Sequence, residues 1–136
     1  MPIIIEVVAA IIFYKDKVLV TQRKFNKNID FSYKYEFPGG KVEKGEKKLI
    51  ALKRELREEL DLELKNFEHF ESYKYKYHNT EILLHFYLSK IKNLKLSLRV
   101  HECYKLLKIK ELASLDWLAA DYKVIKKLEQ IYLKSI

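Results

Sequence analysis

The sequence predicts an α+β fold in which helices cover a mixed β-sheet, and three observations support this prediction. Strand-like and helix-like segments alternate irregularly, as strands, a helix, a hairpin, a strand and a final helix. The chain has 136 residues, about the size of one domain, and contains neither a linker nor an internal repeat. Hydrophobic residues make up 49% and charged residues 34%, which is typical of a chain that buries a core. We therefore expect residues 1–136 to form a single domain.

The chain begins with two apolar segments that are predicted to be strands. Residues 3–13 are strongly apolar apart from Glu6, and residues 18–23 form a second apolar run after a turn at residues 15–17. No basic segment precedes the first run and charged residues end it early. We therefore interpret it as a buried strand rather than a signal peptide or a membrane span. The polar residues 24–34 are expected to form a loop.

Glycine is scarce and is confined to one segment. Gly39, Gly40 and Gly45 are the three glycines of the chain, whereas an average composition would give roughly nine or ten. Glycine permits tight turns and close approach of the backbone to another group. We therefore interpret residues 38–46 as a turn of special geometry.

Residues 46–60 are predicted to form a helix. Leucines spaced three, four and four apart form a stripe that faces the core, namely Leu49, Leu52, Leu56 and Leu60. On a second face lie Glu55, Glu58 and Glu59, at i, i+3 and i+4. Carboxylates this close repel one another, and a divalent cation would compensate because carboxylate oxygens are its preferred ligands. The alternative is a solvated acidic face neutralised by neighbouring basic side chains.

A β-hairpin is predicted next. Residues 67–77 and 80–90 alternate in polarity around a turn at residues 78–79. The first strand of the hairpin ends with alternating tyrosines, at positions 73, 75 and 77. We favour packing in the core or on the sheet for these tyrosines over stacking on a base.

The last third of the chain is predicted to contain a short strand and a helix. Residues 91–99 are expected to be a loop or irregular strand, 104–109 a strand and 110–113 a helical turn. Asp121 is a suitable N-cap for a final helix at residues 122–134. The inward side chains of that helix are expected to be Val124, Ile125, Leu128 and Ile131.

The net charge of +8 has two explanations. One is attraction to polyanions such as nucleotides or nucleic acid, and the other is a lysine-rich solvated surface. Because the lysines are scattered and form no long basic run, we favour the solvated surface. The single cysteine, Cys103, cannot form an intramolecular disulfide, which is consistent with a reducing, cytoplasmic setting.

The segment around the predicted helix resembles the signature of the Nudix hydrolases. Gly40 is followed after five residues by Glu46, and after seven more by residues 54–59, Arg-Glu-Leu-Arg-Glu-Glu. One position departs from the signature, which has a glycine where this chain has Asp61. Asp tolerates the left-handed conformation of a helix end better than most residues, so we expect a small stability cost and intact catalysis. The preceding residues 35–41 resemble the lead-in of the MutT-type branch.

This resemblance implies an α/β/α sandwich with a mixed β-sheet and a catalytic loop–helix motif. It also implies that Glu55, Glu58 and Glu59, helped by the Gly40 carbonyl, hold Mg²⁺ or Mn²⁺. Arg54, part of the same catalytic signature, and Glu46 are then largely structural. Eight residues of straight helix span roughly 12 Å, so a pair between them requires Glu46 to lie in a loop that folds back.

The resemblance further implies candidate residues outside the signature. A glutamate before the last strand joins the metal site or serves as base in related enzymes. Glu102 occupies that place here, although it also fits an exposed loop carboxylate. For the substrate, Arg23 would contact base or phosphate, Gly39 would let the backbone approach phosphate, and Asp121 would contact the base edge. Phe37 either faces the base or packs in the core.

The expected function is Mg²⁺-dependent hydrolysis of (deoxy)nucleoside triphosphates to monophosphate and pyrophosphate, for example of 8-oxo-dGTP in nucleotide-pool sanitation. Alternatives with the same chemistry are CTP or modified pyrimidine triphosphates, a nucleotide sugar, a dinucleotide or the 5′ end of an RNA. A non-catalytic nucleotide-binding module is a third possibility. The chain is expected to act as a monomer or homodimer, without a membrane partner and without nucleic acid other than such an RNA end.

Overall fold

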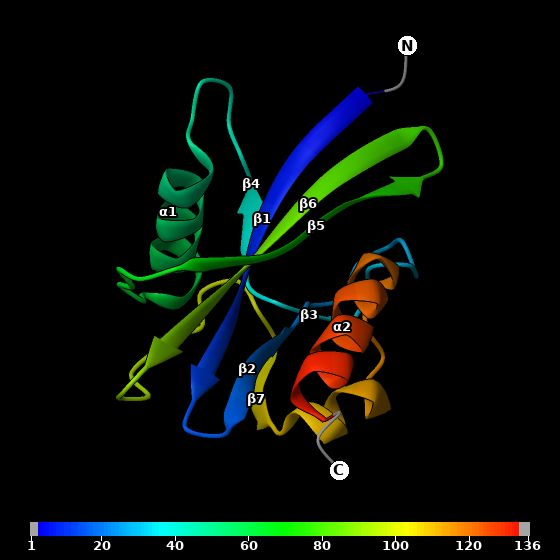
Figure 1. Cartoon of the computed structure of the whole chain (residues 1–136). Coiled ribbons are helices and arrows are strands. Elements are labelled where there is room, and N and C mark those ends of the chain that lie inside the picture. Colours follow the sequence, from blue (N-terminus) through cyan, green and yellow to red (C-terminus); the bar gives the residue numbers. More distant parts are fainter. Residues whose placement is uncertain (1–2, 134–136) are drawn as a thin grey trace.

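The protein is a mixed β-sheet between two helices, described by a computed structural model for residues 3–133 (Figure 1). The strands are β1 (Ile3–Tyr14), β2 (Lys17–Gln22), β3 (Tyr35–Glu36), β4 (Gly39–Lys41), β5 (Glu68–Tyr77), β6 (Thr80–Ile91) and β7 (Cys103–Leu107). The helices are α1 (Lys48–Leu60) and α2 (Tyr122–Tyr132), with short 3₁₀ helices at Ile109–Ser114 and Ala119–Asp121. No helix among these residues is long and apolar enough to cross a membrane.

Strand β1 organises the sheet, whose main order is β3-β2-β1-β6-β5. It runs parallel to β6 along its whole length and antiparallel to both β2 and β4. Strands β5 and β6 form the predicted hairpin, and β7 lies antiparallel beside β2. The glycine-containing strand β4 is therefore paired with the central strand of the molecule.

Two hydrophobic cores lie on opposite faces of the sheet, as the alternation of β1 predicts. Ala9 and Ile11 belong to the core under α2, whereas Val8, Ala10 and Ile12 belong to the core under α1. Each helix contributes the apolar stripe of an amphipathic helix to its own core. The arrangement is the α/β/α sandwich that the sequence predicts.

The first helix begins later than expected, at Lys48 instead of Glu46. It ends as predicted, because Asp61 has the left-handed backbone conformation, with φ 57°. The Asp61 N–H donates to the Arg57 carbonyl, and the Leu62 N–H donates to the Leu56 carbonyl at 3.3 Å. An aspartate therefore terminates this helix where the signature has a glycine.

Several local predictions are wrong. Leu49 and Ile131 are 37% and 44% exposed, so neither packs in a core as the periodicity suggested. Asp121 precedes α2, but its side chain makes no capping hydrogen bond. The short strands β3 and β4 were not predicted; β4 lies in the segment that was interpreted as a glycine turn. The predicted last helical residue, Lys134, lies outside the described residues.

Candidate functional site

A cavity of about 670 Å³ opens beside β1 and the start of β4. It brings together most of the site residues predicted from the sequence, which are Arg23, Phe37, Gly39, Gly40, Glu55, Glu59 and Asp121. Glu55 and Glu59 come from α1 and Asp121 from the segment before α2, and the charge of Arg23 acts on both Glu59 and Asp121. The cavity therefore has the size of a small-molecule site, with polar groups contributed by several separate elements.

The two glutamates come from successive turns of α1. Burial raises the pKa of Glu59 to about 8, and the nearby negative charges of Glu36 and Glu55 add to this effect. Oxygen Oε1 of Glu59 is buried and has no hydrogen-bond partner. Burial also raises the pKa of Glu55, although the guanidinium of Arg54 opposes the shift. A buried carboxylate without a partner is costly, and a cation would relieve that cost.

This donor set fits a divalent cation in part. Glu55 and Glu59 line the cavity, and Oε1 of Glu59 has no hydrogen-bond partner; hard cations prefer carboxylate oxygens of this kind. The side chain of Glu58, a third predicted ligand, is 57% exposed and does not line the cavity; it lies 3.4 Å from the Arg54 guanidinium. Within residues 3–133 no three acidic, histidine or cysteine side chains are already grouped as a metal site.

Arg54 joins the helix to the loop that precedes it. Its Nε and Nη2 donate to the two carboxylate oxygens of Glu46 at 2.8 and 2.9 Å. Its Nη1 donates to Glu55 at 2.9 Å, and Nη2 also donates to the Lys41 carbonyl at 3.1 Å. Because Glu46 precedes the helix, the loop folds back as the predicted pair requires. This network lowers the pKa of Glu46 to about 2 and holds Glu55 in place.

The three glycines serve different geometric needs. Gly39 and Gly40 lie in the extended strand β4, and only Gly45 has a positive φ, of 79°. A β-carbon on Gly39 would collide with the Val8 carbonyl, and one on Gly40 would collide with the Glu55 carboxylate. Gly40 thus lies directly against a predicted metal ligand, whereas Gly45 only turns the chain toward α1.

The opposite end of the cavity contains a buried carboxyl group. Asp121 is 4% exposed, and its Oδ2 accepts a hydrogen bond from the Phe37 N–H at 3.3 Å. Burial raises the pKa of Asp121 to about 8, with a further contribution from Glu36. The ring of Phe37 packs in the core against Trp117, with centroids 4.8 Å apart. Phe37 therefore borders the site while its ring belongs to the core.

Glu36 is a site residue that the sequence reasoning did not identify. Its carboxylate lies 3.2 Å from Arg23 Nη1 and 2.9 Å from Nε2 of the buried His101. It lines the cavity and raises the pKa of both Glu59 and Asp121. The only local signal is its place two residues before Pro38, since its partners are distant in sequence.

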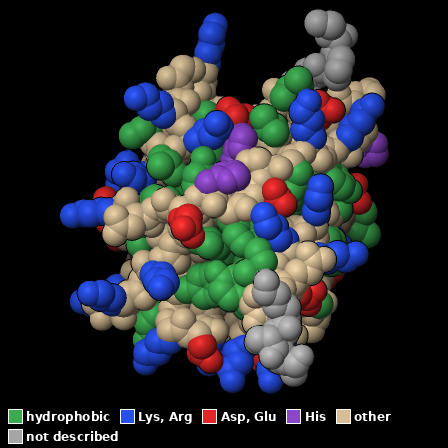
Figure 2. Space-filling view, viewed as in Figure 1, with side chains coloured by type: hydrophobic (Ala, Val, Ile, Leu, Met, Phe, Trp, Pro, Cys, Tyr) green, Lys and Arg blue, Asp and Glu red, His purple; other side chains and the backbone are tan. Residues whose placement is uncertain are grey.

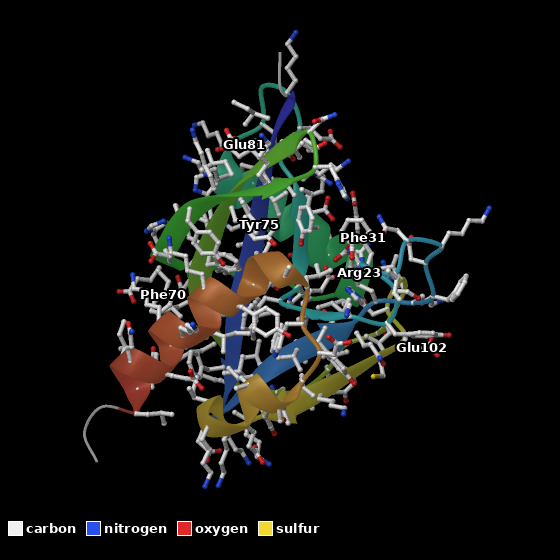
Figure 3. The ribbon with its side chains drawn as sticks, turned by 90° about the vertical axis from the view of Figure 1, so that its right-hand side faces the viewer. Arg23, Phe31, Phe70, Tyr75, Glu81 and Glu102 are labelled. Atoms are coloured by element: carbon white, nitrogen blue, oxygen red, sulfur yellow. The ribbon has the colours of Figure 1, made fainter. Side chains whose placement is uncertain are left out.

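Arg23 lines the cavity, whereas Glu102 does not. The Arg23 guanidinium lies over the ring of Phe31, 5.6 Å from its centroid, at the cavity. Glu102 is exposed and is not among the residues that line the cavity. Its N–H donates to the Gln22 carbonyl at 2.8 Å. Figure 3 shows Arg23 beside Phe31, and Glu102 near the outer edge of the molecule.

An apolar wall completes the cavity. It is formed by Phe31, Tyr77, Ile82, Leu84, Leu118 and Ala120. The Tyr77 hydroxyl accepts a hydrogen bond from the Ala120 N–H at 3.2 Å, which connects the hairpin to the segment before Asp121. Tyr73 instead packs in the core, stacked on Phe86. Of the alternating tyrosines, Tyr77 is the one that the cavity exposes to a ligand.

Comparison with known proteins gives the family. A model of the NUDIX domain matches residues 5–128, which include every cavity-lining residue. The chain belongs to the Nudix hydrolase family. Nudix hydrolases generally need a divalent metal, which agrees with the unpartnered oxygen of Glu59.

Relatives of this Nudix hydrolase include enzymes named for two different activities. An 8-oxo-dGTP diphosphatase of Buchnera aphidicola is 37% identical over 117 residues, which cover 85% of this chain and 90% of the relative. A CTP pyrophosphohydrolase of Escherichia coli is 44% identical over 81 residues, 60% of this chain and 58% of the relative. The solution structure of the E. coli ORF135 protein superimposes with a TM-score of 0.84 at 30% identity, covering 96% and 92% of the chains.

Proposed function

We propose that this Nudix hydrolase cleaves (deoxy)nucleoside triphosphates to a monophosphate and pyrophosphate, with Mg²⁺ as its metal and Mn²⁺ as a substitute. We further propose 8-oxo-dGTP as the preferred substrate, in nucleotide-pool sanitation. The observation that carries the proposal is that one cavity contains side chains suited to the metal and phosphates and a side chain suited to the base. Glu55 and Glu59 are available for the metal and phosphates, and the buried Asp121 is available for the base.

At the phosphate end, Glu55, Glu58 and Glu59 would hold the metal, with the Gly40 backbone beside them. A bound divalent metal neutralises phosphate charge and lowers the pKa of a water molecule. Arg54 fixes the position of the Glu55 carboxylate. Oxygen Oε1 of Glu59 is available to orient the attacking water or to accept its proton. Glu102 as metal ligand or base stays a prediction.

At the base end, the raised pKa of Asp121 makes its carboxyl group neutral at pH 7. A neutral carboxyl group offers one O–H donor and one acceptor. The edge of 8-oxoguanine presents the O6 acceptor beside the N7–H donor, which matches this pair. Unmodified guanine presents two acceptors on that edge, O6 and N7, and matches it less well. Asp121 therefore favours the oxidised base.

CTP is the second candidate substrate. The E. coli relative named CTP pyrophosphohydrolase is 44% identical over its matched residues. Cytosine presents an N4 amino donor beside the N3 acceptor, so a neutral carboxyl group can pair with it too. The other alternative substrates stay predictions, namely a nucleotide sugar, a dinucleotide or an RNA 5′ end. The oligomeric state, monomer or homodimer, and the cytoplasmic location also stay predictions.

The experiment that tests this function is a substrate panel. Pyrophosphate release is measured with Mg²⁺ for 8-oxo-dGTP, dGTP, CTP and oxidised dCTP, and kcat/KM is compared. We expect the highest value for 8-oxo-dGTP. A higher value for CTP would select the second candidate, and no release from any triphosphate with Mg²⁺ or Mn²⁺ would refute the proposal. Glu102→Gln in the same assay tests that residue, with at least a tenfold loss of kcat expected if it acts as ligand or base.

A further inference from the structure

Two hollows lie away from the catalytic cavity and form one continuous groove. The first, of about 830 Å³, is bordered by the ends of β1 and β6 and by α2, and the second, of about 490 Å³, adjoins it. Both are lined by Phe13, Lys15, Lys90 and Tyr132, which makes them one surface. On β1, Ala9 lines the catalytic cavity, and the four residues to Phe13 span roughly 13 Å of strand. The groove is therefore a separate site.

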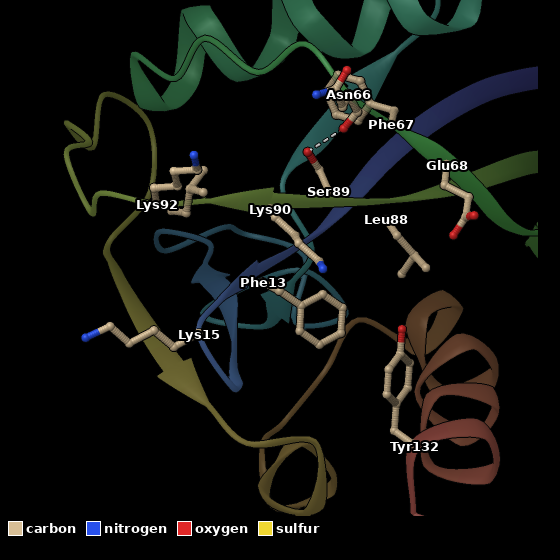
Figure 4. A pocket seen from close by; sticks show the side chains of 11 residues that line it. Phe13, Lys15, Asn66, Phe67, Glu68, Leu88, Ser89, Lys90, Lys92 and Tyr132 are labelled. Atoms are coloured by element: carbon tan, nitrogen blue, oxygen red, sulfur yellow. Dashed lines mark hydrogen bonds between the residues drawn. The ribbon is translucent and has the colours of Figure 1, made fainter.

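The floor of this groove is aromatic and aliphatic. The rings of Phe13 and Tyr132 lie 5.4 Å apart between centroids, and Tyr132 is 43% exposed. Leu88 and Phe67 extend the apolar floor of the first hollow. Figure 4 shows Phe13, Leu88 and Tyr132 around the hollow, with Lys90 extending toward Phe13. Phe13 and Phe67 are half-buried, so Tyr132 is the exposed ring on which a planar base can stack.

The rim of the groove is rich in lysine. Its basic side chains are all exposed, and they are Lys15, Lys90, Lys92, Lys108 and Lys110. Among the described residues, one of these five lysines forms an ion pair, namely Lys108 with Asp16 at 4.0 Å. The acidic side chains that border the groove are Asp16 and Glu68. Figure 2 shows the apolar patch on this face with basic side chains around it. The local charge is positive and mostly unpaired.

We propose that this groove binds single-stranded nucleic acid without sequence specificity. The chemistry is that of stacking platforms bordered by positive charge, in which bases stack on aromatic rings and cations follow the phosphates. All the basic groups are lysines, which act as point charges along a backbone, rather than arginines that grip one phosphate with two bonds. The proposal goes beyond the pyrophosphohydrolase reaction and does not depend on it.

The test is fluorescence anisotropy of the whole chain with a fluorescein-labelled 15-mer of deoxythymidine that carries no 5′ phosphate, in EDTA. We expect log K to fall linearly with log salt, with a slope of about −2 to −3 for three to four phosphate contacts. Lys15→Glu with Lys90→Glu weakens binding at least tenfold and flattens the slope. Tyr132→Ala weakens binding roughly tenfold and leaves the slope unchanged, because it removes stacking only.

Two further variants make the test sharper. Glu68→Gln removes a negative charge from the rim and is expected to strengthen binding, an effect that general destabilisation cannot produce. Lys47→Glu, on an exposed residue that precedes α1, changes the net charge as one rim substitution does and is expected to weaken binding less than twofold. Triphosphate turnover stays at the parent level in all groove variants. Tm stays there in the charge variants, whereas Tyr132→Ala lowers it by removing the ring contact with Phe13.

Three outcomes would overturn the proposal. The first is equal affinity in the parent and in the Lys15→Glu, Lys90→Glu double variant. The second is a loss in the Lys47→Glu control equal to that in the Lys15→Glu single variant, which would show that net charge alone attracts the oligonucleotide. The third is displacement of the oligonucleotide by an equal concentration of free mononucleotide, which would show a single-nucleotide site. The absence of pyrophosphate release in the substrate panel would not affect these binding measurements, so the two proposals can be refuted separately.

Discussion

The guanidinium of Arg54 grips both carboxylate oxygens of Glu46, eight residues earlier in the chain, at 2.8 and 2.9 Å. This pair closes the loop before α1 and leaves the third guanidinium nitrogen to hold Glu55. Arg54→Lys keeps the charge but loses the bidentate hydrogen bonding to the Glu46 carboxylate. We expect kcat to fall about 10- to 100-fold and Tm to decrease, as for other residues that position a ligand.

Steady-state kinetics and a thermal melt check this prediction. Lys53→Ala, on the neighbouring residue of the same helix, is the control and is expected to keep the parent kcat. A normal kcat in the Arg54→Lys variant would contradict a positioning role for the guanidinium.

Removal of the Glu59 charge is expected to abolish turnover while preserving or raising stability. The folded-state pKa of Glu59 is raised from 4.5 to about 8, so its ionised form is disfavoured by folding. The cost is absent below about pH 4.5, grows as the pH rises and is complete above pH 8. Glu59→Gln in EDTA should therefore raise Tm most at pH 8 to 9 and not at all near pH 4.5.

Glu58→Gln is the matched control, because the Glu58 side chain is 57% exposed. We expect it to lower activity as a proposed ligand but to raise Tm at pH 8 to 9 much less than Glu59→Gln does, because Glu58 is the smallest of the contributions to the raised pKa of Glu59. Thermal melts of both variants between pH 4.5 and 9 decide the point. Parent-level turnover in the Glu59→Gln variant would refute the assignment of the metal site.

The neutral form of Asp121 predicts a pH-dependent preference for the base. Its pKa is raised from 3.8 to about 8, so the O–H donor is present at pH 7 and disappears as the pH rises through 8. We expect kcat/KM for 8-oxo-dGTP to decline above about pH 8. Asp121→Asn retains a donor and an acceptor and should keep activity while losing this decline.

Asp121→Ala is the companion variant, and it should lower kcat/KM for 8-oxo-dGTP about 10- to 100-fold, the range of a lost base contact. The measurement is kcat/KM for 8-oxo-dGTP and dGTP from pH 6 to 9.5. An unchanged ratio of the two substrates in the alanine variant would place base recognition elsewhere.

Substitution of two glycines separates catalysis from stability. A β-carbon on Gly40 would collide with the Glu55 carboxylate, so Gly40→Ala is expected to reduce kcat about 100-fold by displacing that carboxylate. Gly45 has φ 79° with open space around it, so Gly45→Ala costs roughly 1–2 kcal/mol in backbone strain. Kinetics and urea unfolding of both variants check this. Similar kcat losses in the two would contradict the contact between Gly40 and Glu55.

The fold is largely predictable from local patterns, because period-two and helical alternation report which face of each element is buried. The hairpin β5–β6 and the strand β1 lie within one or two residues of their predicted bounds. Periodicity identifies a face but not how far along a helix the packing extends. The exposed Leu49 and Ile131, near the ends of their helices, illustrate that limit.

The site is predictable where a motif is contiguous and not where partners are distant in sequence. The signature identified Glu55, Glu59 and Gly40, which share one cavity. Glu36 was missed because its partners, Arg23 and His101, are brought to it only by the pairing of strands. The basic rim of the groove was missed for the same reason, since its lysines are scattered along the chain and meet only in the folded sheet.

The short segment from Phe37 to Gly40 connects the two ends of the cavity. The backbone of Phe37 holds the carboxyl group for the base, and Gly40 lies against the carboxylate for the metal. The segment bends at Pro38 and enters β4 at Gly39. Because β4 is paired with the central strand β1, the backbone of this segment is held in place. It therefore sets the distance between a base bound at Asp121 and a phosphate bound at Glu55. Evolution can exchange the base by changing side chains around Asp121, whereas a longer substrate would require a different backbone.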